Sequence, residues 1–244
     1  MKMKIYKLAA LSALALFISV SVSAQTADEI IGKYVKAIGG KEMLSKINSL
    51  YTENSMEVMG MQITGKTTVL NGKGMKQEME VMGSNMVTCI TDKGGWTINP
   101  MTGGTSPEDM PAAQYNSGKA QITIGAPFLN YAETGYKAEL AGTDTIAKVT
   151  AVKIKLTGPD NTAAFYFFDP NSFLLLKSIS QAESQGQMVE NIVLYTDYKQ
   201  TDGYTMPYKM NMDMAGGQFN MTMNVTKVEL NKPVNDSIFI KPAR

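Results

Sequence analysis

The sequence contains no histidine, one cysteine (Cys89) and one arginine (Arg244) among its 244 residues. Without histidine, Ser-His-Asp catalysis, Cys-His catalysis and histidine-bound metals are excluded. A single cysteine excludes an intramolecular disulfide and any metal site built from several cysteines. The scarcity of arginine argues against arginine forks that read phosphate or guanine. We therefore expect no metal, no cofactor and no nucleic-acid partner.

The first 24 residues have the pattern of a cleavable export signal. Three lysines precede the apolar run 8–20, and a stretch of small residues ends at Ala24. The run is shorter than the ~20 residues that a membrane-spanning helix needs. We expect cleavage after Ala24, which leaves residues 25–244 as a periplasmic domain without a lipid anchor. Those residues carry 20 basic and 22 acidic side chains, a balance that does not attract anionic surfaces.

The domain is predicted to begin with short helices. Thr26 and Glu29 form a capping-box pattern, whose side chains satisfy free N–H groups in the first turn of a helix. Apolar residues then recur at helical spacing up to Ile38, and Gly39-Gly40 predicts the end of the helix. A second helical piece is expected over residues 41–47.

From about residue 50 the apolar period changes from 3.6 to 2, which indicates strands. Asn71-Gly72 predicts a hairpin, and further turn sequences separate about eleven segments of strand length. Residues 101–120 predict a loop with one short helix, and residues 121–133 a further helix, together forming a lid over one sheet face. The predicted fold is mainly β: a single curved antiparallel sheet, or incomplete β-barrel, with two or three short helices.

Methionine is unusually frequent, with 17 of 19 methionines in residues 25–244. Many stand at alternate positions of predicted strands, so they point to one face of the sheet. Unbranched methionine side chains adapt to varied apolar ligands, although they also serve as ordinary core residues under helices. Trp96 fits either a pocket mouth or the core. The candidate lipid-binding residues are Met61, Ile63, Met75, Met79, Trp96, Phe128, Met206, Tyr208, Met210, Met212, Met214, Phe219, Met221 and Met223.

Three stretches carry a resemblance to a known family: Tyr34-x-x-Ala37-x-Gly39-Gly40, the segment 92–100 (Asp-Lys-Gly-Gly-Trp-Thr-Ile-Asn-Pro), and Phe168-Asp169-Pro170-Asn171 followed by three leucines. With the order of predicted elements, they resemble the LolA/LolB-like outer-membrane lipoprotein-sorting proteins, of the soluble periplasmic carrier type. The resemblance implies a half-barrel with a helical lid and acyl chains of lipoproteins in its apolar cavity. It also implies transfer to the outer membrane, an inner-membrane release complex, an outer-membrane acceptor and a monomer.

One motif departs from the family. The soluble carriers usually hold a pocket arginine on the strand after the first hairpin, and residues 71–76 here read Asn-Gly-Lys-Gly-Met-Lys. Lys73 or Lys76 could stand in for it, but a lysine lacks the planar fork of arginine. The gating of the lid and the identity of the cargo are therefore open.

Two other classes of function compete with a lipid carrier. The first is an envelope protein–protein interaction module with a methionine-rich core and no lipid ligand. The second is an enzyme that uses paired carboxylates, with Glu78 and Glu80, or Asp92 and Asp109, as candidates. Glu78 and Glu80 share the polar side of a predicted strand, where acids usually serve solubility. We expect a carrier without catalytic activity.

Overall fold

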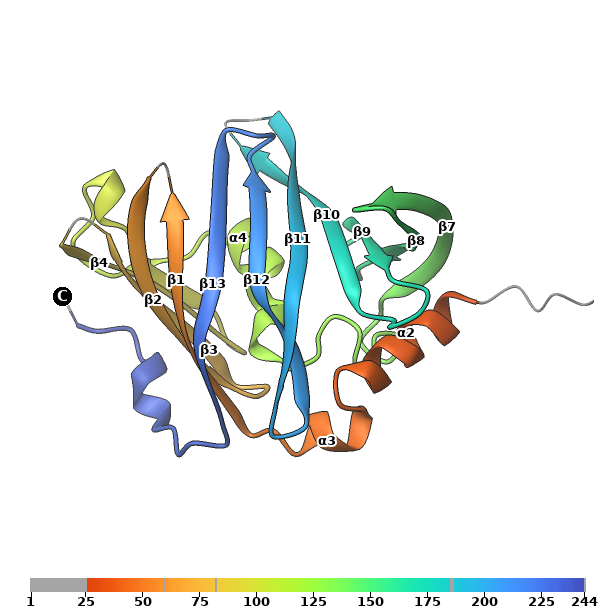
Figure 1. The fold of residues 1–244 in the computed structure, drawn as a ribbon. Coiled ribbons are helices and arrows are strands. Elements are labelled where there is room, and N and C mark those ends of the chain that lie inside the picture. The colour runs from red at the N-terminus through yellow and green to blue at the C-terminus, as the bar shows by residue number, and fades with distance from the viewer. Residues whose placement is uncertain (1–25, 59, 82, 185–186, 244) are drawn as a thin grey trace, which may run out of the picture.

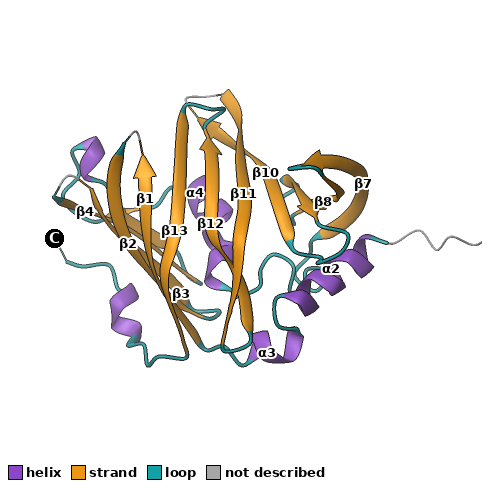
Figure 2. Cartoon of the chain, viewed as in Figure 1, coloured by secondary structure: helices purple, strands orange, loops and turns teal. Residues whose placement is uncertain are grey.

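The computed structural model describes residues 26–243, apart from residues 59, 82 and 185–186. They form one open antiparallel sheet of thirteen strands and three short α-helices (Figures 1 and 2). The sequence predicts this mainly β architecture but about eleven strands. One additional strand, β6, lies in the segment predicted to be a loop. The predicted signal, residues 1–24, lies outside the described residues, and no described helix is long and apolar enough to cross a membrane.

The first half of the chain forms two helices and then six strands. They are α2 (Ala27–Ala37), α3 (Lys41–Ser45), β1 (Ser49–Val58), β2 (Met61–Leu70), β3 (Gly74–Val81), β4 (Ser84–Thr91), β5 (Gly95–Ile98), the 3-10 turn η1 (Pro100–Thr102) and β6 (Glu108–Asp109). The second half forms α4 (Ala112–Gly118), η2 (Lys119–Ile122), β7 (Lys137–Ile146), β8 (Val149–Thr157), β9 (Ala163–Phe168), β10 (Leu175–Ser184), β11 (Gln187–Thr201), β12 (Tyr204–Met214), β13 (Phe219–Leu230) and η3 (Asp236–Phe239).

The order of strands places the first and last long strands side by side. Strands β1 to β6 run outward from the middle of the sheet to one edge, and β7 to β13 run inward from the opposite edge. Strand β13 then pairs with β1, so that Leu50 lies opposite Leu230. The chain between β6 and β7, residues 110–136, therefore passes from one edge of the sheet to the other. We call it the crossing segment; it is visible behind the central strands in Figure 1.

The first helix forms as predicted. Thr26 and Glu29 make the reciprocal hydrogen bonds of a capping box, and the helix ends at Ile38 ahead of two glycines with positive φ. A side chain at Gly39 would collide with the backbone of the β11–β12 hairpin, because a Cβ there would lie 2.8 Å from the carbonyl oxygen of Gly203. The amide of Thr205 also donates to the carbonyl of Ile38. The glycine end of α2 thus docks directly on this hairpin.

The crossing segment is less helical than predicted. The short helix expected within 101–120 is α4, but residues 123–135 form successive turns rather than a helix. Gly125 and Asn130 have positive φ, and Pro127 has no amide to donate, so a continuous helix cannot form there. The Asn71 side chain also captures this segment: its Oδ1 accepts from the amide of Ile124, while its Nδ2 donates to the carbonyl of Ile47.

The helices and the crossing segment cover part of one sheet face, which we call the inner face. One cluster beneath them contains Val69, Met75 and Ile90 from β2–β4, packed against Leu44 and the crossing segment. A second contains Ile30 and Ile31 of α2 with Ile154, Phe168 and Phe128. A third lies on the opposite, outer face, where the C-terminal Phe239 covers Cys89 and Trp96.

Candidate functional site

Cross-strand register brings the apolar side chains of five strands into two rows on the inner face. The first row crosses β2, β1, β13, β12 and β11, and each of its members pairs with the next one across the strand boundary. In that order, its members are Ile63, Met56, Met223, Met210 and Tyr195. In the second row, on the same strands, are Met61, Val58, Met221, Met212 and Val193. Phe219 and Met214 pair beyond them. We call these residues the methionine surface.

The methionine surface is largely outside the hydrophobic clusters. Apart from Tyr195, which packs against the second cluster, none of its residues belongs to the three described clusters or to the apolar side chains packed on them. Met56 is buried, but Met61 is 44% exposed and Phe219 50% exposed, and the other methionines of the two rows are partly exposed. Part of the inner face is therefore an apolar surface that the helices and the crossing segment leave accessible.

Strand alternation explains why the opposite face of β12 and β13 is polar. Between the methionines of β12 stand Lys209, Asn211 and Asp213, which pair with Asn224, Thr222 and Asn220 of β13. Asn211 Oδ1 accepts a hydrogen bond from the Thr222 hydroxyl. Because successive side chains point to opposite faces, these polar residues face outward while the methionines face inward.

Several predicted site residues lie away from the methionine surface. Met75 and Phe128 are buried in the two inner-face clusters, below the rows. Trp96 is buried on the outer face, where its Nε1 donates to the carbonyl of Phe239. Of the two alternatives for Trp96, the structure therefore shows the core position. Trp96 pairs with Cys89, and Cys89 pairs with Lys76, so these three side chains lie on the outer face, whereas Met75 lies on the inner face.

The remaining predicted residues border the rows. Met79 lies on the inner face of β3, opposite Gly65. Met206 and Tyr208 belong to the part of β12 nearer the β11–β12 hairpin, and both are partly exposed. The Tyr208 hydroxyl is 3.0 Å from that of Thr201, and the Lys199 ammonium lies 4.7 Å from its ring centroid.

Half-buried tyrosines gather around Tyr34 of α2, next to Tyr195 at the end of the first methionine row. The Tyr195 hydroxyl is 2.9 Å from the Ser178 hydroxyl, and the Tyr198 hydroxyl donates to the carbonyl of Leu175. Burial raises the pKa of Tyr34 well above its ordinary value, with smaller contributions from Tyr198 and Tyr204. Burial likewise raises the pKa of Tyr204 to about 12. These hydroxyls are therefore neutral at physiological pH. Sequence reasoning missed the cluster because its members come from distant segments.

Neither lysine proposed to replace the family's pocket arginine faces the inner side. Lys76 points outward, since its neighbour Met75 points inward, and it pairs with Glu78 at 3.3 Å. Lys73 lies in the β2–β3 turn and pairs with Asp236 at 3.4 Å near the C-terminus. The crossing segment is instead held by Asn71, and by the hydrogen bond from the Tyr131 hydroxyl to Asp28 of α2.

The candidate carboxylates of the enzymatic alternative serve other contacts. Glu78 pairs with lysines on two strands of the outer face, and Asp109 pairs with Lys241. Glu80 and Asp92 are exposed. Within the described residues, no three of the Asp, Glu, Cys or His side chains converge in a way that could hold a metal ion.

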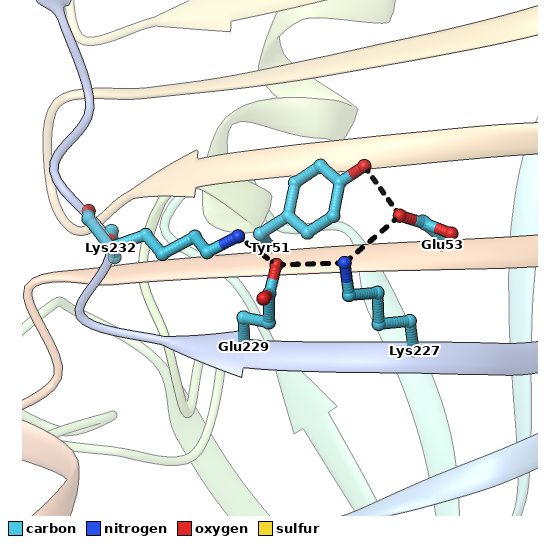
Figure 3. A network of polar contacts seen from close by, with 6 residues as sticks. Tyr51, Glu53, Lys227, Glu229 and Lys232 are labelled. Atoms are coloured by element: carbon cyan, nitrogen blue, oxygen red, sulfur yellow. Dashed lines mark hydrogen bonds and ion pairs between the residues drawn. The ribbon is translucent and has the colours of Figure 1, made fainter.

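The outer face carries a polar network at the junction of β1 and β13 (Figure 3). The Tyr51 hydroxyl donates to Glu53 at 3.0 Å, and Lys227 bridges Glu53 and Glu229. Lys232 completes the network by pairing with Glu229. The charges balance, and the lysine and Glu53 side chains are about half exposed, so the network orders the junction between the two halves of the sheet rather than forming a charged binding site.

No protein-family model matches the chain, and no curated protein matches it in sequence. Solved structures do. A LolA superfamily protein from Nitrosomonas europaea is 13% identical with a TM-score of 0.59, over 89% of this chain and 99% of that one. A DUF1329 family protein from Desulfovibrio piger is 10% identical with a TM-score of 0.60, over 89% and 98%. A domain assigned to outer-membrane lipoprotein sorting from Vibrio parahaemolyticus is 14% identical with a TM-score of 0.58, over 87% and 95%.

At these identities the likeness is one of fold, and it spans most of the described chain. It agrees with the resemblance that the sequence suggests. The chain has the fold of the LolA-like proteins: an open antiparallel sheet whose inner face is partly covered by helices and a crossing segment.

Proposed function

We propose that this protein is an exported carrier that binds the alkyl chains of a lipid or lipoprotein on its methionine surface, in the periplasm. The observation that carries the proposal is the pair of apolar rows across five strands, left partly exposed on the inner face. An exposed, contiguous apolar surface usually marks a site for an apolar partner. The LolA-like fold supports the same assignment, and the predicted signal over residues 1–24 supports the location.

The dimensions of the surface suit a long alkyl chain. Neighbouring strands lie about 4.8 Å apart, so each five-strand row extends across about 19 Å. Burial of alkyl groups contributes about 0.8 kcal/mol per CH₂, or on the order of 10 kcal/mol for a chain of about 16 carbons before the costs of binding. Unbranched methionines hold a chain without a single fixed shape, which favours release as well as capture.

The first test is native mass spectrometry of protein purified from the periplasm without detergent, followed by lipid extraction. We expect a bound acyl lipid or lipoprotein, which would also name the cargo. A mass that matches the mature chain alone, unchanged after incubation with phospholipid, would overturn the carrier proposal in favour of the interaction module.

A pair of variants tests the site itself. Met210→Asp with Met212→Asp places two charges on the methionine surface, and we expect it to abolish binding of an apolar fluorescent probe while the fold survives. The matched control, Asn211→Asp with Asn224→Asp, adds two charges to the outer face of β12 and β13. Equal probe binding by the two folded double variants would remove the methionine surface from the site.

A further inference from the structure

A band of polar side chains crosses the inner face next to the methionine surface. On β1 to β4, Thr52 lies opposite Thr67, Thr67 opposite Gln77, and Gln77 opposite Thr88. Asn54 lies between this line and the first methionine row. The polar band, as we call these five residues, separates the methionine rows from the covered cluster below.

The polar band has no hydrogen-bonding partners within the described chain. None of its five side chains forms a hydrogen bond or ion pair with another described residue. Asn54 is only 5% exposed and Thr52 only 9%. The Oδ1 atom of Asn54 is fully buried and accepts no hydrogen bond. Buried polar groups in folded proteins are almost always paired, so an unpaired amide requires an explanation.

The surroundings of Asn54 suggest that its partner comes from outside the chain. Opposite Asn54 stands Gly65, and a Cβ at that position would lie 2.8 Å from Asn54 Oδ1 and 3.2 Å from Met79 Cγ. The amide and Met79 therefore already fill the space that a side chain at position 65 would take, and the side chain that covers the amide is the flexible Met79. Rotation of an unbranched side chain can uncover the acceptor without moving the backbone.

We propose that Asn54 is the polar subsite for the ligand of the methionine surface, and that the ligand is amphipathic, with an N–H donor at one end of its alkyl chain. Asn54 is two residues from Met56 along β1, or about 7 Å, so an alkyl chain whose polar end lies beside Asn54 passes Met56 and continues along the first methionine row. The Oδ1 atom accepts from the N–H of an amide-linked chain, and the hydroxyl of Thr52 or Thr67, on β1 and the neighbouring β2, donates to its carbonyl. A deprotonated fatty acid has no donor and leaves Oδ1 unpaired.

This inference rests on the proposed function, and a pair of probe ligands separates the two. Decanamide and N,N-dimethyldecanamide share their chain and carbonyl, but only the first has N–H donors. Each is titrated against protein loaded with diphenylhexatriene, a hydrocarbon probe. We expect decanamide to displace the probe at about tenfold lower concentration than N,N-dimethyldecanamide does, the equivalent of one hydrogen bond. The two extra methyl groups of N,N-dimethyldecanamide favour apolar binding and therefore act against this preference.

The variant Asn54→Leu removes the acceptor and keeps the size of the side chain. We expect it to bind both amides equally, with a melting temperature no lower than that of the wild type, because it removes an unpaired buried group. Asn224→Leu, the same change at an exposed outer position, should keep the tenfold preference. A lower melting temperature for Asn54→Leu, with the preference intact, would mean that Asn54 is structural and would overturn the inference.

The other outcomes are equally decisive. Equal binding of the two amides by the wild type would overturn the polar subsite and leave the carrier proposal standing. Failure of both amides and of diphenylhexatriene to bind would overturn the proposed function, and this inference with it. Loss of the preference in both Asn54→Leu and Asn224→Leu would show a general effect of leucine and also reject Asn54 as the subsite.

Discussion

The inner face of the sheet has two regions, and they differ in packing. The lower region holds branched and aromatic residues such as Ile90 and Phe168, buried under α2, α3 and the crossing segment. The methionine surface above it is formed mainly by unbranched side chains, many of them partly exposed. Branched and aromatic side chains specify one packing arrangement, whereas methionine tolerates several. The lower region therefore stabilises the fold, and the methionine surface is the part that we propose binds the ligand.

Alkaline pH should affect the lower region most strongly. Burial raises the pKa of several tyrosines there, including Tyr34, and that of Tyr204 to about 12. A group whose pKa is raised on folding stabilises the protein below its unfolded pKa of about 10 and loses that contribution as pH rises through the folded value. We expect the free energy of unfolding to fall steeply above about pH 10. This loss should be larger than that caused by any single substitution in the predictions that follow. Urea unfolding at pH 8 and 11 with absorbance at 295 nm measures it; equal stability at both values would contradict the prediction.

The second largest effect should come from truncating one side chain in each region, which compares how much each region contributes to the free energy of unfolding. Leu44 is completely buried, so Leu44→Ala should lower the free energy of unfolding by about 3 kcal/mol through lost burial and a cavity. Met61 is 44% exposed, and Met61→Ala should cost less than about 1 kcal/mol. Chemical denaturation compares the two variants. Similar losses would mean that the methionine surface is packed as tightly as the region below.

The attachment of the crossing segment is a smaller but more local target. Asn71→Ala leaves the amide of Ile124 and the carbonyl of Ile47 without their side-chain partner, and we expect a loss of about 2 kcal/mol. Hydrogen exchange at Ile124 should accelerate. Asn85→Ala, at an exposed position of β4, is the control. If exchange at Ile124 were the same in both variants, Asn71 would not hold the segment.

The smallest effect should come from exchanging methionine for leucine within the rows. Met212→Leu with Met221→Leu conserves volume, so stability should change by less than about 1.5 kcal/mol. Binding should change in selectivity rather than strength, because branched leucines adapt less to chain length. Displacement of diphenylhexatriene by alkyl amides of increasing length measures this. An unchanged length profile would show that adaptability does not reside in these two methionines.

Local patterns predicted much of the fold. The capping box of Thr26, the glycine stop after Ile38 and the hairpin at Asn71 depend on neighbouring residues, and each forms as expected. Alternation on β12 and β13 also placed Met210, Met212, Met221 and Met223 on one face. These predictions succeed because a residue's face along one strand depends only on the period of 2.

The features that the sequence could not place depend on long-range contacts. The face on which Trp96 lies follows from its register with Cys89 and Lys76. Two turns separate these strands, and the sequence alone does not fix the register across them. The helix expected over residues 121–133 is absent, since Gly125 and Pro127 interrupt it and Asn71, far away in sequence, captures the amide of Ile124. The unpaired amide of Asn54 becomes visible only when its neighbours on β2 and β3 are known.

The pairing of β1 with β13 also determines how the sheet is completed during synthesis. Each half is a series of hairpins between consecutive strands, which can form as the chain emerges. The central seam needs residues near 50 and 230 to meet, so it closes only when nearly the whole chain has been made. Until then β1 has an unpaired edge in the middle of the future sheet, the type of edge that invites aggregation. A chain that ended before Phe219 would therefore lack its central strand, and would be two half-sheets joined by residues 110–136.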